Sequence, residues 1–185
     1  MNLDELRNDI IIKQKKGLPF IITSVVIWLL ITVVAALQID IMLKNILVFC
    51  CSTPLLPLAW KLGKKMGVDI FSKANELGSL GLLFTMNQVI YLLIVMWVFN
   101  AVPDKMIMVY AMVFGAHLLP YSWLYKSKSY RIFAVIIPVL ALVLGNMFNG
   151  FVVSGTLAIV EIIFVIILYN EFKLYSFDSA FHYAT

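Results

Sequence analysis

The stretch of sequence that decides the fold is residues 151–169, FVVSGTLAIVEIIFVIILY, an apolar run in which Glu161 is the single charged side chain. A helix of this length measures about 28 Å at 1.5 Å per residue, close to the thickness of the hydrocarbon core of a bilayer. The run therefore predicts a membrane-spanning helix that carries a carboxyl group near its middle.

Similar apolar runs occur five more times on the N-terminal side of this segment. The chain has 185 residues, of which 63% are apolar and only 13% charged, so its composition is far from that of a water-soluble domain. We predict an all-α fold, a polytopic transmembrane helical bundle of six spans within residues 17–170. The expected spans are residues 18–37, 41–60, 79–99, 106–125, 132–148 and 151–169.

Two polar segments flank the predicted bundle. Residues 1–16 have apolar side chains at helical spacing, with Asn2 as an N-cap and Glu5 three positions later. This pattern predicts a short amphipathic helix that lies at the membrane interface. Residues 171–185 are expected to form a cytoplasmic tail.

The second predicted span and the segment after it have unusual features. Pro54 and Pro57 predict a bend in this span, because proline lacks the N–H group that a continuous helix needs. Residues 61–78 then mix lysines with apolar side chains, as interfacial segments do. The lysines expected to contact anionic lipid headgroups are Lys61, Lys64 and Lys65.

The positive charges are distributed unevenly between the two sides of the predicted spans. Twelve of the fourteen Lys and Arg residues fall on the side of the two termini, and only Lys44 and Lys105 fall on the other. Because cytoplasmic loops carry an excess of Lys and Arg, both termini are predicted to be cytoplasmic. We expect a multi-pass protein of the plasma membrane, of the bacterial inner-membrane type, with the lipid bilayer as its partner and no nucleic acid.

Two span ends resemble each other. LLPLAWKLGKK begins at Leu55 and LLPYSWLYKSK at Leu118, an offset of 63 residues. Duplication of a helical hairpin accounts for the match. Coincidence also accounts for it, since Leu, Pro and interfacial Trp are common at the ends of spans.

Polar side chains inside the spans are the candidates for a functional site, because each is costly in hydrocarbon. A charged Glu161 would cost about 2.5–3.5 kcal/mol at the centre of the bilayer, so it must be neutral, paired or facing water. We predict a polar layer at mid-membrane. Its candidate members are Glu161, His117, Asn87 and Gln88 as a substrate or proton site, and Ser52, Thr53, Thr85 and Ser154 as secondary lining.

This polar layer indicates a small transporter that handles protons or a small polar solute. The alternative is a regulatory, receptor-like or assembly subunit in which the layer only holds helices together. A weaker alternative is a lipid-modifying enzyme. A homodimer or a membrane partner subunit is compatible with each of these functions.

Short segments resemble motifs of rhomboid proteases, which also have a six-helix core. They are VSG at Val153–Gly155 and GAH at Gly115–His117, but the order of Ser and His in the chain is reversed and their predicted depths differ by roughly 12 Å. We therefore predict no catalytic residue. No cofactor or metal is predicted either, since the adjacent Cys50 and Cys51 would point about 100° apart on a helix.

Overall fold

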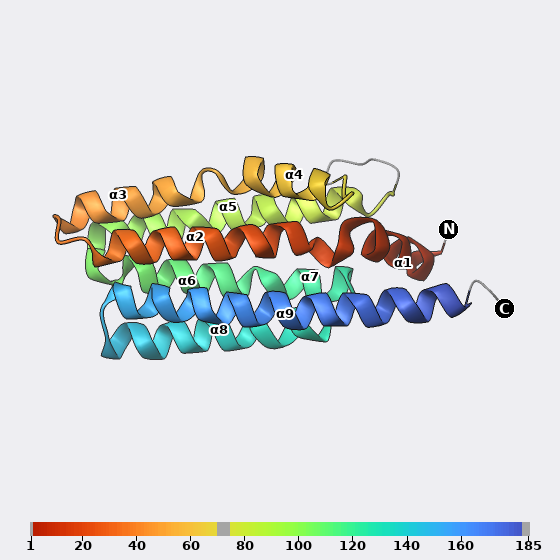
Figure 1. Ribbon diagram of the computed structural model, residues 1–185. Helices are drawn as coiled ribbons and strands as arrows, with labels where there is room; N and C mark the ends of the chain where they lie inside the picture. The colour runs from red at the N-terminus through yellow and green to blue at the C-terminus, as the bar shows by residue number, and fades with distance from the viewer. Residues whose placement is uncertain (1, 70–74, 183–185) are drawn as a thin grey trace.

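The computed structural model describes residues 2–69 and 75–182, which form a bundle of long helices that run side by side (Figure 1). Residues 70–74 of the predicted interfacial segment and 183–185 of the predicted tail lie outside the described residues. The elements are α1 (Leu3–Gln14), η1 (Lys15–Gly17), α2 (Leu18–Ala36), α3 (Ile41–Ser52), α4 (Leu55–Lys65), α5 (Gly78–Ala101), η2 (Pro103–Lys105), α6 (Met106–Ala116), α7 (Leu118–Leu124), α8 (Lys128–Met147) and α9 (Gly150–His182).

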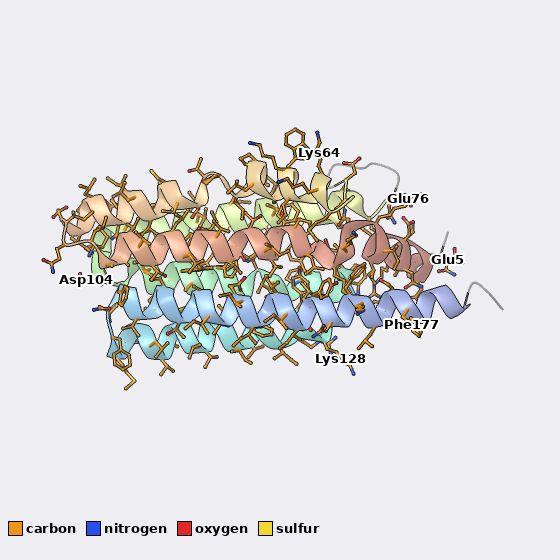
Figure 2. All side chains as sticks on the ribbon, in the orientation of Figure 1. Glu5, Lys64, Glu76, Asp104, Lys128 and Phe177 are labelled. Atoms are coloured by element: carbon orange, nitrogen blue, oxygen red, sulfur yellow. The ribbon has the colours of Figure 1, made fainter. Side chains whose placement is uncertain are left out.

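Within the described part of the chain, six helical segments are long and apolar enough to cross a membrane. This finding confirms the predicted all-α bundle of six spans. Helices α2 and α9 lie at the centre and pack along each other, with α3, α4 and α5 on one side and α6, α7 and α8 on the other (Figure 1). Both termini lie at the same end of the bundle, together with Lys64 and Lys128, whereas Asp104 lies at the opposite end (Figure 2).

The N-terminal helix begins with the capping box that the sequence predicts. The Asn2 side chain accepts a hydrogen bond of 2.8 Å from the Glu5 backbone N–H, and the Glu5 carboxylate accepts one of 3.0 Å from the Asn2 N–H. Ile10 and Ile11 are buried, so α1 packs against the end of the bundle. Its position at a membrane interface remains a prediction.

The second and fourth spans are each broken into two helices. The expected bend in the second span is a break at Thr53 and Pro54, between α3 and α4. The fourth span was expected to be one helix but divides at His117, because Pro120 has no N–H to donate to the carbonyl of Ala116. Each break directly precedes one of the two Leu-Leu-Pro sequences, so the matching segments begin matching half-helices.

Two helices extend beyond their predicted ends. Helix α4 continues through Lys65, because Ala59 and Gly63 are buried while the lysines of this turn are exposed. Helix α9 continues through His182, well into the predicted tail, because Phe172 and Tyr175 pack against the core of the bundle. The segment 171–182 is therefore helical.

Helices α6 and α8 pack closely because a glycine faces a proline ring between them. A Cβ atom added at Gly115 would lie 2.5 Å from Cδ of Pro138 and 2.6 Å from Cγ2 of Ile137. Atoms of a ring and of a β-branched side chain cannot rotate away from such a contact. The separation of the two helices thus depends on the missing side chain of Gly115.

We expect Gly115→Ala to destabilise the bundle by roughly 1–3 kcal/mol, because α6 and α8 must move apart to admit the methyl group. Gly81→Ala is the matched control, since nothing lies within 4 Å of a Cβ atom at Gly81 of α5. The measurement is the thermal unfolding midpoint of each purified variant in detergent. Equal midpoints for the two variants would contradict this account of the α6–α8 contact.

Candidate functional site

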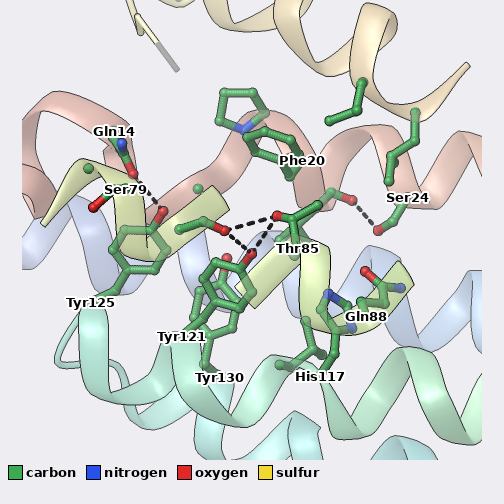
Figure 3. A pocket seen from close by; sticks show the side chains of 18 of the residues that line it. Gln14, Phe20, Ser24, Ser79, Thr85, Gln88, His117, Tyr121, Tyr125 and Tyr130 are labelled. Atoms are coloured by element: carbon green, nitrogen blue, oxygen red, sulfur yellow. Dashed lines mark hydrogen bonds between the residues drawn. The ribbon is translucent and has the colours of Figure 1, made fainter. Parts of the chain in front are cut away.

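A cavity of about 500 Å³ lies in the half of the bundle nearest the termini (Figure 3). Ser79, in the first turn of α5, and Gln88, nine residues later, both line it, so the cavity extends roughly 14 Å along this helix. Its wall comes from α2, the start of α4, α5, the α6–α7 break and the start of α8. The cavity therefore lies between the two broken spans.

A buried carboxyl group lies directly behind the deep end of the cavity. Ser24 of α2 lines the cavity, and its hydroxyl lies 2.5 Å from Oε2 of Glu161 on α9. Glu161 has no exposed surface, and its Oε1 atom has no hydrogen-bond partner among the described residues. No ion pair of the described part of the chain includes Glu161. Ser24 is thus the link between this carboxyl group and the cavity.

Ser24 also lies close to a second acceptor. Its hydroxyl oxygen is 2.8 Å from the carbonyl oxygen of Ile21, one turn earlier in α2. A hydroxyl group has one proton to donate and can accept as well. Ser24 can therefore donate to a Glu161 carboxylate, or donate to Ile21 while it accepts the proton of a neutral Glu161.

One wall of the cavity is a column of aromatic rings, which we call the aromatic ladder. Consecutive ring centroids lie 5.3 Å apart from Phe114 to His117, 5.9 Å from His117 to Tyr121 and 5.9 Å from Tyr121 to Tyr125. Tyr130 of α8 completes the ladder, 5.9 Å from Tyr121 and 5.7 Å from Tyr125. The sequence analysis missed this wall, although the spacing of 3, 4 and 4 residues places the first four rings on one helical face.

The tyrosines of the ladder are held by their hydroxyl groups (Figure 3). The contacts are Tyr121 to the Gly81 carbonyl at 3.0 Å and to the Thr85 hydroxyl at 2.9 Å, Tyr125 to Gln14 at 2.8 Å, and Tyr130 to the Lys16 carbonyl at 2.9 Å. The phenol of Tyr125 donates to the side-chain oxygen of Gln14. The hydroxyl groups are thus engaged with the protein.

An ion pair with a buried lysine lies at the turn from α1 into α2. The ammonium group of Lys16, which is 1% exposed, lies 2.8 Å from Glu171, and this carboxylate also accepts hydrogen bonds from Ser127 and Ser129. Lys15, Lys16 and Gly17 all have positive φ angles, of 47°, 52° and 71°, and they turn the chain from α1 into α2. The pair fixes this turn to α8 and α9.

A smaller cavity of about 260 Å³ lies at the opposite end of the bundle, lined in part by Lys44, Lys105 and Asn45. Along α2, the smaller cavity is lined by Ala35 and the large cavity extends as far as Ser24. Trp28 lies between these two positions and is 1% exposed. It packs against Tyr110 at 5.8 Å and Phe114 at 5.6 Å between ring centroids, so aromatic side chains fill this intervening level.

The residues of the predicted polar layer fall in different places. Gln88, His117 and Thr85 line the large cavity, together with Ser24. The Nδ1 atom of His117 bonds to the carbonyl of Phe114, so this nitrogen carries a proton. Glu161 lies behind Ser24, a residue that was not among the predicted ones.

The other predicted residues do not meet Glu161. Ser52 contacts the Tyr110 hydroxyl at 2.5 Å, and Ser154 donates to backbone carbonyls of its own helix. Thr53 is exposed at the α3–α4 break, and Asn87 is half-buried on α5 outside the lining of the large cavity. These four residues therefore form no single layer around the carboxyl group.

The three lysines expected to contact lipid headgroups all lie on α4. Lys61, Lys64 and Lys65 are exposed, and the ammonium group of Lys64 lies 3.9 Å from the centre of the Trp60 ring. In the matching half-helix, the Arg7 guanidinium group lies 4.7 Å from the ring of Trp123. Both tryptophans thus carry a basic side chain, while contact with lipid stays a prediction.

The fold defines the chain as a helical membrane protein with six spans, whose described residues enclose a large cavity. It belongs to a family described as Family of unknown function (DUF7010), whose model matches residues 3–171. The match covers five spans, the sixth as far as residue 171, and the residues around both cavities. Neither the search of curated proteins nor the search of solved structures found a match.

We expect Ser24→Ala to lower the stability of the protein by roughly 1–3 kcal/mol, because the substitution leaves the buried Glu161 without its hydrogen-bond partner. Thr23→Val is the matched control, since Thr23 is equally buried on α2 but bonds only to the Pro19 carbonyl of its own helix. Thermal unfolding in detergent measures both variants. A loss of thermal stability in Thr23→Val as large as that in Ser24→Ala would contradict the special role of Ser24.

Proposed function

We propose that the protein is a small proton-coupled transporter whose cavity receives a solute and whose Glu161 binds and releases the coupling proton. The observation that carries the proposal is the cavity that ends at Ser24, whose hydroxyl lies 2.5 Å from the buried Glu161. A carboxyl group without a cation partner is costly in a membrane interior, and residues kept there at such cost commonly serve ion or proton pathways. We further propose that the termini, and with them the mouth of the cavity, face the cytoplasm.

The hydroxyl of Ser24 supports proton exchange at Glu161. With two acceptors in reach, it satisfies the charged carboxylate in one orientation and the neutral acid in the other. Neither state requires a helix to move. A purely structural carboxyl group would need only one of these two arrangements, since it keeps one protonation state.

The arrangement of the two cavities supports alternating access. The large cavity lies in the half of the bundle nearest the termini, and Trp28 and Tyr110 lie at the level between it and the smaller cavity. A cavity closed off from the far side by such a layer is a feature of a carrier in one of its two states. The breaks at Thr53 and His117 provide places where the half-helices α4 and α7 can pivot.

We expect a step in external pH to drive a transient charge movement in the wild-type protein, because protonation of Glu161 changes the charge inside the membrane. The measurement is the current from proteoliposomes on a solid-supported membrane. Glu161→Gln should abolish the transient, since an amide keeps the hydrogen bonds but does not titrate. Glu5→Gln, an exposed carboxyl group of α1, is the matched control and should retain it. A full transient in Glu161→Gln would refute the proposed proton site.

A receptor-like subunit with the same cavity would open on one side only. We expect Gln88→Cys, at the deep end of the cavity in a chain with Cys50 and Cys51 replaced by serine, to react with a membrane-impermeant thiol reagent from either side. The rates from the two sides should change in opposite directions with pH. Reaction from the termini side alone would exclude transport and favour the receptor-like subunit.

A further inference from the structure

The chemistry of the cavity wall restricts the solute that it can bind. Glu76 is the single Asp or Glu among the described residues that line the cavity, and none of these residues is Lys or Arg. Most of the remaining lining is aromatic or aliphatic. A solute with a negative charge would therefore lose its hydration without gaining a cationic partner.

The aromatic ladder lines this wall with rings, of which those of His117 and Tyr121 are partly exposed. The rings of Phe114, Tyr125 and Tyr130 are buried. Because the hydroxyl groups of Tyr121, Tyr125 and Tyr130 are engaged with protein acceptors, their rings are held in place. The face of an aromatic ring carries partial negative charge and attracts organic cations, most strongly where water is excluded. Phe20 of α2 also lines the cavity, on the side opposite the ladder (Figure 3).

A negative charge becomes available at the deep end when Glu161 is ionised. Its Oε2 atom is one hydrogen bond from Ser24, so a cation that touches Ser24 lies within a few ångströms of the carboxylate. The elements packed against α9 bring Ser24 from α2 and Tyr130 from α8, and His117 lies at the α6–α7 break of the same cavity. Lys16 of η1 is paired with Glu171, ten residues farther along α9 or about 15 Å away.

We propose that the solute of this cavity is a hydrophobic organic cation, which binds on the aromatic ladder and whose charge replaces the proton of Glu161. This inference rests on the proposed function, since it names the substrate class of the same site. The charge balances, because one monovalent cation enters as one proton leaves the carboxyl group for the solvent. The cavity volume of about 500 Å³ is within the range of sites for drug-sized ligands.

The test compares two probes of nearly equal size and shape but opposite charge, tetraphenylphosphonium and tetraphenylborate. Each is titrated separately into the purified full-length protein in detergent, with empty micelles subtracted. We expect saturable binding of tetraphenylphosphonium with the release of about one proton per cation bound, and at least tenfold weaker binding of tetraphenylborate. Equal binding of the two probes, or no saturable binding of the cation, would overturn the proposal.

Substitutions in the ladder test the role of the rings. Tyr121→Leu should weaken binding of the cation roughly tenfold, whereas Tyr121→Phe, which keeps the ring, should change it by less than about threefold. Tyr91→Leu is the matched control, because Tyr91 is exposed on the outer face of α5. Phe114→Leu, which removes another ring of the ladder, provides a second test if Tyr121→Leu does not fold. Unchanged binding in the folded ring variant would overturn the role of the ladder.

The release of a proton when the cation binds identifies the residue that supplies the negative charge. Glu161→Gln should bind the cation at least tenfold more weakly and release no proton, while His117→Gln should still release it. Loss of release in His117→Gln alone would transfer the role to the imidazole and overturn the assignment to Glu161. If the protein binds the cation but shows no pH-driven charge movement, the inferred solute class stands and the proposed transport is refuted. If it shows the charge movement but does not bind the cation, the proposed transport stands and the inferred solute class is refuted.

Discussion

The packing of α2 against α9 is the contact on which the rest of the structure depends. These two helices form the centre of the bundle, and the remaining spans are arranged on either side of them. The hydrogen bond between Ser24 and Glu161 crosses this contact. Because hydrocarbon offers no partner for a polar group, helices that carry one are restricted to the few orientations in which it is satisfied. The bond therefore sets the rotation of both central helices, and with it the deep end of the cavity.

The breaks in the second and fourth spans give the bundle its cavity. A continuous helix satisfies its own backbone, whereas a break exposes carbonyl groups that need a cavity or a nearby donor. At the second of these breaks the Nδ1 atom of His117 supplies a donor to the Phe114 carbonyl. The half-helix α7 then carries Tyr121 to the wall that faces α5, where its hydroxyl contacts Gly81 and Thr85. The break in the fourth span and the aromatic side chains beside it thus together form one wall of the cavity.

Much of the architecture could be predicted from local sequence, but the site could be predicted only in part. Apolar runs determine spans because the bilayer imposes a fixed thickness, and the capping box of Asn2 and Glu5 acts within a single turn. Glu161 was selected because a buried carboxyl group is rare in a span. Its partner was missed because depth along a helix does not reveal which helices are neighbours. Asn87 is at a suitable depth yet lies outside the lining of the cavity, and Gln88 lines the cavity but is not the partner of Glu161. The continuation of α9 to His182 depends on the packing of Phe172 and Tyr175 against distant parts of the chain, which no local pattern contains.

The pairing of Lys16 with Glu171 has a consequence for how the protein is made. The two residues are separated by 155 positions, so the ribosome must complete the last span before the first one can acquire its partner. Until then the ammonium group of Lys16 has to stay hydrated among lipid headgroups, since an unpaired charge is not stable in the interior. The ion pair that fixes the turn from α1 into α2 can therefore form only after the final helix has been made.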